Sequence, residues 1–173
     1  MNYAEIKYYD IANGVGVRTS LFVSGCRNCC PDCFNRQTWD FNFGKPFTKE
    51  IESAIIESVK PDYVSGLTVL GGEPFERENQ QCVLDLIKNF KSLYPNKTVW
   101  IFSGFTYEEL VGESRVSSYI AREILSLSDV LVDGRFERDK KNISLKFRGS
   151  ENQRIIDLVK TKKLDKITLW EEE

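Results

Sequence analysis

The pattern of apolar residues is the feature of this 173-residue chain that most restricts its fold. Short apolar runs alternate with segments whose apolar residues recur at helical spacing. The runs cover residues 19–24, 67–70, 98–103, 130–132 and 167–169. Strands that are apolar on both faces and alternate with helices are typical of parallel sheets. We therefore predict an α/β fold with a mostly parallel sheet, and the length predicts a single domain over residues 1–173.

Helical stripes fill the gaps between these strands, over residues 51–59, 82–93 and 119–127. Two capping-box patterns, Thr106-x-x-Glu109 and Ser150-x-x-Gln153, predict two further helix starts, the second just before Ile155. Ligands of such folds bind at the carboxyl ends of the strands. The most distinctive residues of this chain follow strand ends, so we expect their loops to converge on one site.

The composition excludes several kinds of chemistry. No histidine is present, which excludes Ser-His-Asp and Cys-His hydrolysis, HExxH zinc proteases and His-ligated haem. The net charge of −2 argues against nucleic-acid and polybasic membrane binding. No apolar run approaches the roughly 18 residues of a membrane span, and the N-terminus lacks the apolar region of a signal peptide. We therefore expect no nucleic-acid partner, no membrane and a cytoplasmic location.

Four of the five cysteines lie together after the first predicted strand, at positions Cys26, Cys29, Cys30 and Cys33. In a reducing compartment such a cluster indicates a metal site rather than disulfides. The spacing C-x3-C-x2-C of Cys26, Cys30 and Cys33 suits three thiolates on three irons of a cubane cluster. The fourth iron would then be open to a substrate or cofactor. Two adjoining C-x2-C pairs leave zinc as an alternative, although adjacent cysteines rarely enclose one tetrahedral ion.

A glycine-rich turn, Gly71-Gly72-Glu73-Pro74, ends the second predicted strand. Glycines let the backbone approach a ligand closely, and the exposed carbonyls of the turn could accept from an ammonium group. An ordinary strand-to-helix turn would show the same pattern. Ser103, at the end of the next strand, is a candidate for a cofactor contact by its position alone.

The cysteine spacing and the Gly-Gly-Glu-Pro turn together resemble the radical S-adenosylmethionine enzymes. Within them the chain is similar to glycyl-radical-enzyme activases, above all those of anaerobic ribonucleoside-triphosphate reductase. The likeness is carried by residues 10–18, 22–26, 33–39, 131–136 and 148–153. The chain departs from the family where proline, glycine, tyrosine or aspartate is usual, at Val15, Asp32, Phe34 and Glu73.

This resemblance implies a partial (β/α) barrel of the radical S-adenosylmethionine type. It also implies a [4Fe-4S] cluster held by Cys26, Cys30 and Cys33, with Cys29 as a bystander. The open iron would chelate the amino and carboxylate groups of S-adenosyl-L-methionine.

The resemblance also implies the cofactor contacts. Gly72 and Glu73 would hold the methionyl ammonium through backbone groups, while Asp32, Cys33 and Phe34 would contact the cofactor beside the third cluster ligand. No side chain would serve as a catalytic acid or base, because the cofactors carry the chemistry.

The implied reaction is the reductive cleavage of S-adenosylmethionine to a 5′-deoxyadenosyl radical. That radical would take a hydrogen atom from a glycine of the large subunit of anaerobic ribonucleotide reductase. This subunit and an electron donor such as flavodoxin are the implied partners. Two alternatives are a short radical enzyme that acts on a small molecule, and a non-catalytic metal or electron-transfer module.

Overall fold

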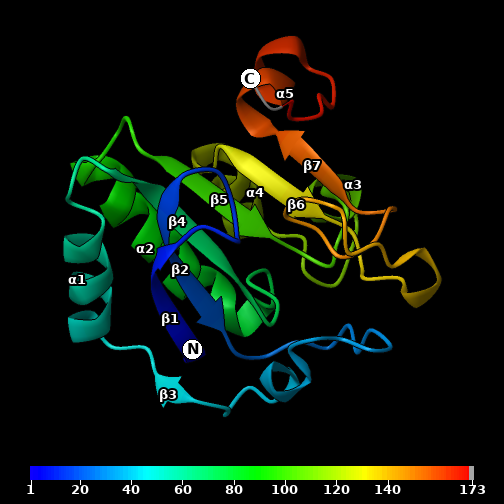
Figure 1. Cartoon of the computed structure of the whole chain (residues 1–173), viewed down its shortest axis with the longest axis horizontal. Coiled ribbons are helices and arrows are strands. Elements are labelled where there is room, and N and C mark those ends of the chain that lie inside the picture. The colour runs from blue at the N-terminus through cyan, green and yellow to red at the C-terminus, as the bar shows by residue number, and fades with distance from the viewer. Residues whose placement is uncertain (172–173) are drawn as a thin grey trace.

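The computed structural model describes residues 1–171; the last two residues of the predicted domain lie outside the described residues. Within that range, seven strands form one sheet in the order β3-β1-β2-β4-β5-β6-β7 (Figure 1). They are β1 (Asn2–Asp10), β2 (Val17–Val23), β3 (Lys45–Pro46), β4 (Val64–Gly71), β5 (Thr98–Phe102), β6 (Val130–Asp133) and β7 (Arg154–Asp157). Strands β2, β4, β5 and β6 run parallel, whereas β1, β3 and β7 pair antiparallel with their neighbours. The α/β class is thus confirmed, and the parallel part is confined to the middle of the sheet.

Among the described residues, four of the five α-helices begin at a residue whose side chain caps them, and the helix that begins at Arg77 is the exception. They are α1 (Lys49–Ser58), α2 (Arg77–Leu93), α3 (Tyr107–Val111), α4 (Tyr119–Leu127) and α5 (Leu158–Leu164), with short 3-10 helices at Arg36–Trp39 and Arg138–Lys140. Thr48 accepts from the N–H of Ile51 at the start of α1, and the predicted capping box of Thr106 and Glu109 opens α3. Among the described residues, no helix is both long and apolar enough to cross a membrane.

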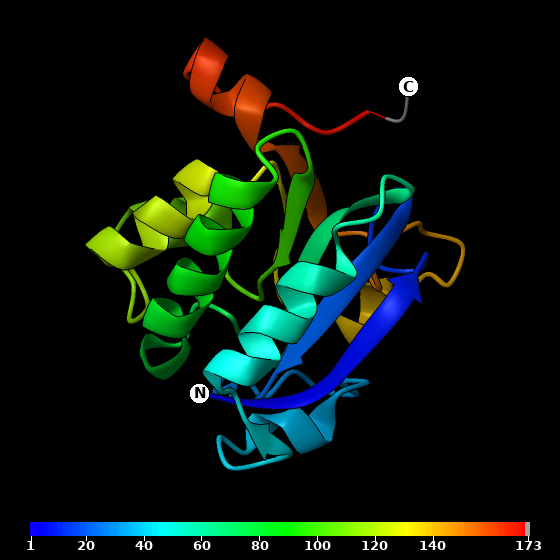
Figure 2. The same ribbon diagram turned by 90° about the vertical axis from the view of Figure 1, so that its left-hand side faces the viewer.

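The two faces of the sheet are covered differently. Alternate side chains of a strand point to opposite faces. One set packs with α1, α2 and α4 in the main core, including Leu21, Leu67, Val69, Ile101 and Leu131. These helices lie together on that side of the sheet (Figure 2). The other face carries a smaller aromatic cluster of Trp100, Val130 and Val132 with Phe102, Phe147 and Trp170. The side without helices is therefore the side on which a ligand can reach the strands.

Two predicted elements at the C-terminal side are wrong. Ser150 and Gln153 open no helix. The Gln153 side chain accepts from the N–H of Ser150, as in a capping box, but the Ser150 hydroxyl accepts from the N–H of Glu137 instead of that of Gln153, and strand β7 follows directly. Ile156 of β7 is fully buried in the main core, which favours the strand over the predicted helix. The predicted strand 167–169 makes only an isolated bridge between Leu169 and Ile156.

Candidate functional site

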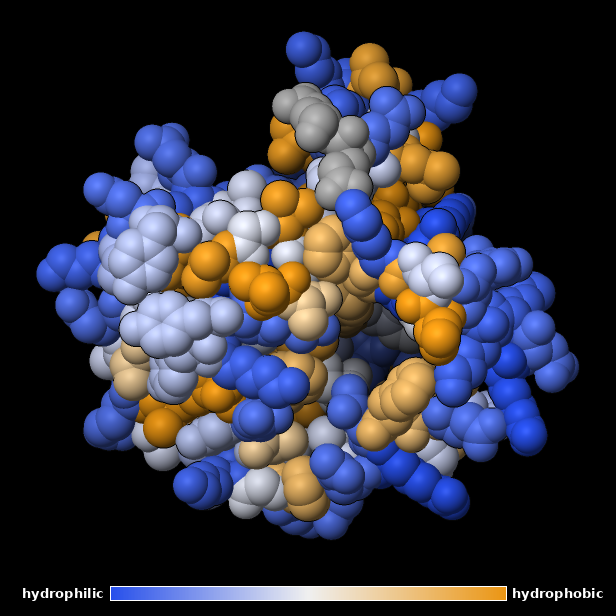
Figure 3. All heavy atoms as spheres, viewed as in Figure 1, coloured by the Kyte–Doolittle hydropathy of each residue, from blue (hydrophilic) through white to orange (hydrophobic). Residues whose placement is uncertain are grey.

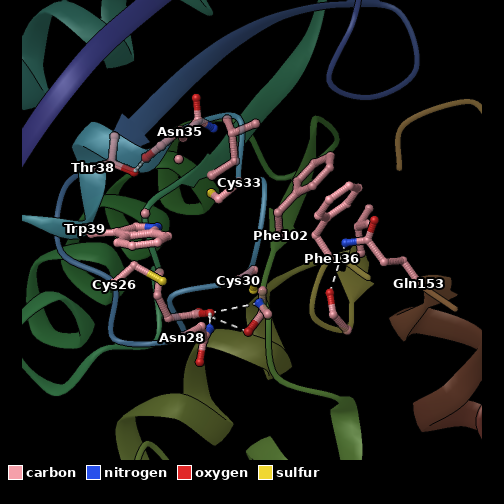
Figure 4. Close-up of a pocket in the computed structure, with 18 residues that line it drawn as sticks. Cys26, Asn28, Cys30, Cys33, Asn35, Thr38, Trp39, Phe102, Phe136 and Gln153 are labelled. Atoms are coloured by element: carbon pink, nitrogen blue, oxygen red, sulfur yellow. Dashed lines mark hydrogen bonds between the residues drawn. The ribbon is translucent and has the colours of Figure 1, made fainter. Parts of the chain in front are cut away.

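A pocket lies where the carboxyl ends of the parallel strands meet. Its volume is about 160 Å³, and it is lined by the loops that follow β2, β4, β5 and β6 (Figure 4). A larger pocket of about 390 Å³ shares part of its lining, namely Cys33, Asn35, Leu70, Phe102, Phe136 and Gln153. The two pockets thus form one groove, and the face shown in Figure 3 is hollowed between hydrophobic and hydrophilic side chains. The predicted convergence of the strand-end loops is observed.

Three of the four clustered cysteines face this pocket. Cys26, Cys30 and Cys33 line it from one loop, whereas Cys29 is exposed and outside the lining (Figure 4). Cys29 has a left-handed backbone with a φ of 48°. That conformation turns the loop locally, so that Cys29 points to solvent while the cysteines on either side stay at the pocket.

Cys26 and Cys30 need a cation before they can become thiolates. Burial and, after it, the carboxylate of Glu73 raise the pKa of Cys26 to about 12. Burial also raises the pKa of Cys30. Bound iron would reverse this, because a metal cation deprotonates a coordinating thiol. Within residues 1–171, no three Cys, His, Asp or Glu side chains gather around a single metal ion. A cubane cluster does not require the three thiols to converge on one point, because each thiolate binds a different iron.

The backbone of the glycine-rich turn packs tightly against the cysteine loop. A Cβ on Gly72 would lie 2.7 Å from the carbonyl oxygen of Gly25. The Gly72 N–H donates to the Val23 carbonyl at 2.8 Å, and the Glu73 N–H donates to the Gly25 carbonyl at 2.9 Å. Both N–H groups are therefore used inside the protein. The Glu73 carbonyl accepts from Asn79 Nδ2 at 3.0 Å and from a backbone N–H, so the Gly72 carbonyl is the freer acceptor of the turn, which suits a cationic donor such as an ammonium group.

The Glu73 side chain ties three loops together. Its carboxylate is fully buried and accepts four hydrogen bonds, from Ser103 Oγ, Asn28 Nδ2 and the N–H groups of Phe75 and Gly104, at 2.8–3.1 Å. Burial raises the pKa of Glu73 to about 7, against the effect of these donors. The Ser103 hydroxyl, a candidate for a cofactor contact, is directed to Glu73 instead.

The two residues that flank Cys33 behave differently. Asp32 is exposed and forms an ion pair with Arg138 at 3.0 Å, outside the lining of both pockets. Phe34 is 71% exposed but lines the larger pocket, where its ring meets Phe136 edge to face at a centroid distance of 5.8 Å. The structure therefore gathers Cys33, Phe34, Gly72 and Glu73 along the groove, and the Asp32 side chain points away from it.

Seven lining residues were not predicted to take part in the site, although all but Asn28 and Phe102 lie in the stretches that carry the family resemblance. They are Asn28, Asn35, Thr38, Trp39, Phe102, Phe136 and Gln153. Strand alternation could have found Phe102, because its neighbour Ile101 faces the helices. Phe136 and Gln153 reach the pocket from irregular loops, whose paths no local pattern determines.

Comparison with known proteins agrees with a thiol-lined site. Residues 12–156 match a family described as a 4Fe-4S single cluster domain. The match spans the cysteine loop and all four strands of the parallel part of the sheet. Fold and site together define an iron–sulfur domain.

The relatives make the assignment more specific. The anaerobic ribonucleoside-triphosphate reductase-activating protein of Pasteurella multocida is 40% identical, over 88% of this chain and 95% of the relative. Those of Escherichia coli K12 and Enterobacteria phage T4 are 38% and 34% identical, over 88% and 90% of this chain and 96% and 93% of the relatives. The chain belongs to the family of anaerobic ribonucleoside-triphosphate reductase-activating proteins, which confirms the resemblance predicted from its motifs.

Proposed function

We propose that this chain activates an anaerobic ribonucleoside-triphosphate reductase by generating a glycyl radical on the large reductase subunit. The observation that carries the proposal is the set of three thiols that face one pocket at the strand ends. In this proposal the chain is a single-domain radical S-adenosylmethionine oxidoreductase, and its seven-stranded sheet with the attached helices is a partial (β/α) barrel. It would act in the cytoplasm, where its thiols stay reduced.

The donor set fits an iron–sulfur cluster. Cys26, Cys30 and Cys33 would hold a [4Fe-4S] cluster, since thiolates are the ligands such clusters prefer and the chain has no histidine to offer. When bound, the cluster and S-adenosyl-L-methionine supply the electron transfer and the 5′-deoxyadenosyl radical that takes a hydrogen atom from the partner's glycine. The chain itself binds, orients and shields these groups.

The residues along the groove divide this work. The Gly72 carbonyl would accept from the methionyl ammonium, with the Glu73 carbonyl, which already accepts two hydrogen bonds within the protein, as a weaker second acceptor. Cys33 and Phe34 would contact the cofactor where the two pockets join, with Asp32 taking part through its backbone. The rings of Phe34, Phe102 and Phe136 line the larger pocket and would exclude water from it.

Anaerobic reconstitution with iron and sulfide tests the proposal. We expect a cubane cluster whose electron paramagnetic resonance spectrum shifts on addition of S-adenosylmethionine. Adding the large reductase subunit and a reductant such as flavodoxin should then give a glycine-centred radical signal. Stably bound zinc without iron would contradict the proposal. Conversion of a small molecule without a glycyl signal would favour the other class of radical enzyme.

A further inference from the structure

A second buried carboxylate, Glu76, lies beside the cysteine loop. Its side chain is only 1% exposed, and it precedes the first residue of α2. A short polar side chain in this position commonly caps its own helix. Glu76 makes no such hydrogen bond. Its partners come instead from two other segments, through Arg27 of the cysteine loop and Arg115 of the α3–α4 connection.

The contact with Arg27 fixes the main chain next to a proposed cluster ligand. Glu76 Oε1 accepts from the backbone N–H of Arg27 at 2.8 Å, and Oε2 accepts from its guanidinium at 2.9 Å. Arg27 directly follows Cys26. The next N–H along the chain, that of Asn28, donates to the Cys26 sulfur. A carboxylate that holds the Arg27 peptide therefore also orients the N–H that points at Cys26.

Arg115 completes the arrangement from the opposite side. Its Nη1 donates to Glu76 Oε2, and its Nη2 donates to Asn28 Oδ1 at 3.2 Å. Its guanidinium stacks on Phe105 with 4.8 Å to the ring centroid. Two consecutive residues of the cysteine loop are thus held in place, Arg27 by the buried Glu76 carboxylate and Asn28 by the Arg115 guanidinium. Buried charges keep such partners because losing one leaves the other unpaired.

We propose that Glu76, assisted by Arg115, is a positioning residue that holds the cysteine loop in its cluster-binding form. The inference rests on the proposed function in one respect, that Cys26 is a cluster ligand. The contacts around metal ligands set their orientation, and their loss commonly costs about 10- to 100-fold in metal affinity. Glu76 would exert this effect through the Arg27 main chain, without touching the cluster.

Iron release from the reconstituted chain tests this inference. Glu76→Ala and Arg115→Ala should release iron to a chelator about tenfold faster than the wild-type chain. They should also alter the electron paramagnetic resonance line shape of the reduced cluster, which a loss of overall stability alone would not do. Glu76→Gln keeps an oxygen for the Arg27 N–H and should recover part of the retention. Glu78→Gln is the matched control, because it removes a second, exposed partner of Arg27 on the same helix.

Hydrogen exchange of the Arg27 amide, measured before any iron is added, separates this inference from the proposed function. Exchange should be about tenfold faster in Glu76→Ala than in Glu78→Gln, since only the former removes the acceptor of that N–H. Equal exchange of the Arg27 amide in Glu76→Ala and Glu78→Gln overturns the positioning role. The role is also overturned if Glu76→Ala and Arg115→Ala release iron no faster than Glu78→Gln. If the wild-type chain takes up no cluster, the proposed function fails, and the exchange rates still decide whether Glu76 holds the loop. Should Glu76→Ala not fold, iron release from Arg115→Ala and Glu76→Gln, each compared with Glu78→Gln, carries the test, and release equal to the control in both overturns the positioning role.

Discussion

The two ends of the parallel strands hold their polar groups in opposite ways. At the amino ends, Arg18 of β2 is 1% exposed, yet all five of its N–H donors have acceptors in the sheet or in the loop before β2. These are Thr68 Oγ1, the carbonyls of Val15 and Leu67, and both the hydroxyl and the carbonyl of Thr98. Burial lowers the pKa of Arg18 to about 10, which leaves the group charged at neutral pH.

At the carboxyl ends, the polar groups are left facing a pocket. Cys26, Cys30 and Cys33 line it, and the turn at Gly72 directs its N–H inward to the protein. A buried group whose partners all belong to the protein stabilises the sheet, whereas groups that face a pocket are available to a ligand. The difference predicts that substitutions at one end should change stability and at the other end should change cofactor binding.

The largest effect is expected at the carboxyl ends. Cys26→Ala, Cys30→Ala and Cys33→Ala should each lose nearly all reconstituted iron, because a proposed ligand is removed, while Cys29→Ala should retain it. The free energy of unfolding of the iron-free chain should change by less than about 1 kcal/mol, since these thiols are only partly buried. Iron and sulfide content and urea unfolding measure the two effects. Loss of iron in Cys29→Ala with retention in Cys30→Ala would reverse the ligand assignment.

The amino ends should give the opposite result. Arg18→Met keeps much of the side-chain volume but leaves several buried acceptors without a donor, so it should lower the free energy of unfolding by about 4 kcal/mol. Urea unfolding measures this loss. Iron bound per folded chain should stay at the wild-type level. A loss below about 1 kcal/mol would show that other groups or water satisfy the acceptors, and the contrast between the two ends would then fail.

The sequence predicts this molecule best where strands are buried on both faces. The runs that became β4, β5 and β6 are mostly apolar and are stopped by glycine or aspartate, so local pattern suffices. Strand β1 escaped prediction because only Tyr3 and Asp10 of its nine residues are buried. Strand β7 was predicted as a helix because a capping-box pattern precedes it, but only half of the box forms, since the Ser150 hydroxyl accepts from the N–H of Glu137 rather than that of Gln153. Edge strands depend on partners elsewhere in the chain.

The same limit applies to the site. Cysteine spacing identified the three pocket thiols, because a short loop fixes their relation locally. The contacts that hold the loop join residues far apart, with 49 positions between Arg27 and Glu76 and 87 between Asn28 and Arg115. No sequence pattern within the loop predicts these long-range contacts. The outward direction of Asp32 likewise depends on Arg138, which a distant segment supplies.

Two glycines, one near each end of β4, sharpen the comparison at a smaller scale. A Cβ on Gly66 would lie 1.9 Å from the Thr98 carbonyl oxygen, and one on Gly72 would lie 2.7 Å from that of Gly25. Because both obstacles are backbone atoms, each alanine must displace a neighbouring segment. Overpacking of this kind costs about 1–3 kcal/mol, and Gly66→Ala should lie at the upper end.

The two glycine variants should differ in more than magnitude. Gly66→Ala moves β4 against β5 and should leave iron retention unchanged. Gly72→Ala moves the turn against the cysteine loop and should speed iron release as well as lower stability. Thermal unfolding of the iron-free chain and chelator release from the reconstituted chain measure the two effects. Faster release in Gly66→Ala than in Gly72→Ala would contradict the division between the ends.

The smallest effect is expected for an exposed charge at the carboxyl ends. Glu108 of α3 pairs with Arg154 at 2.7 Å, and its side chain is 56% exposed. The hydrogen bond from Arg154 lowers the pKa of Glu108 from 4.5 to about 2. Because solvent screens such a pair, Glu108→Gln should cost less than about 1 kcal/mol at pH 7.

The pH dependence of this small effect has a definite sign. The pKa of Glu108 is lower in the folded chain than in the unfolded chain, so its ion pair contributes in full above pH 4.5 and is lost as the pH falls towards 2. The difference in unfolding free energy between wild type and Glu108→Gln should therefore be constant near neutrality and vanish in acid. Urea unfolding at a series of pH values measures it. A difference that grows in acid would mean that Glu108 is stabilised as the neutral acid, so that its carboxyl group would behave like the buried Glu73, whose pKa is raised, rather than like a screened surface charge.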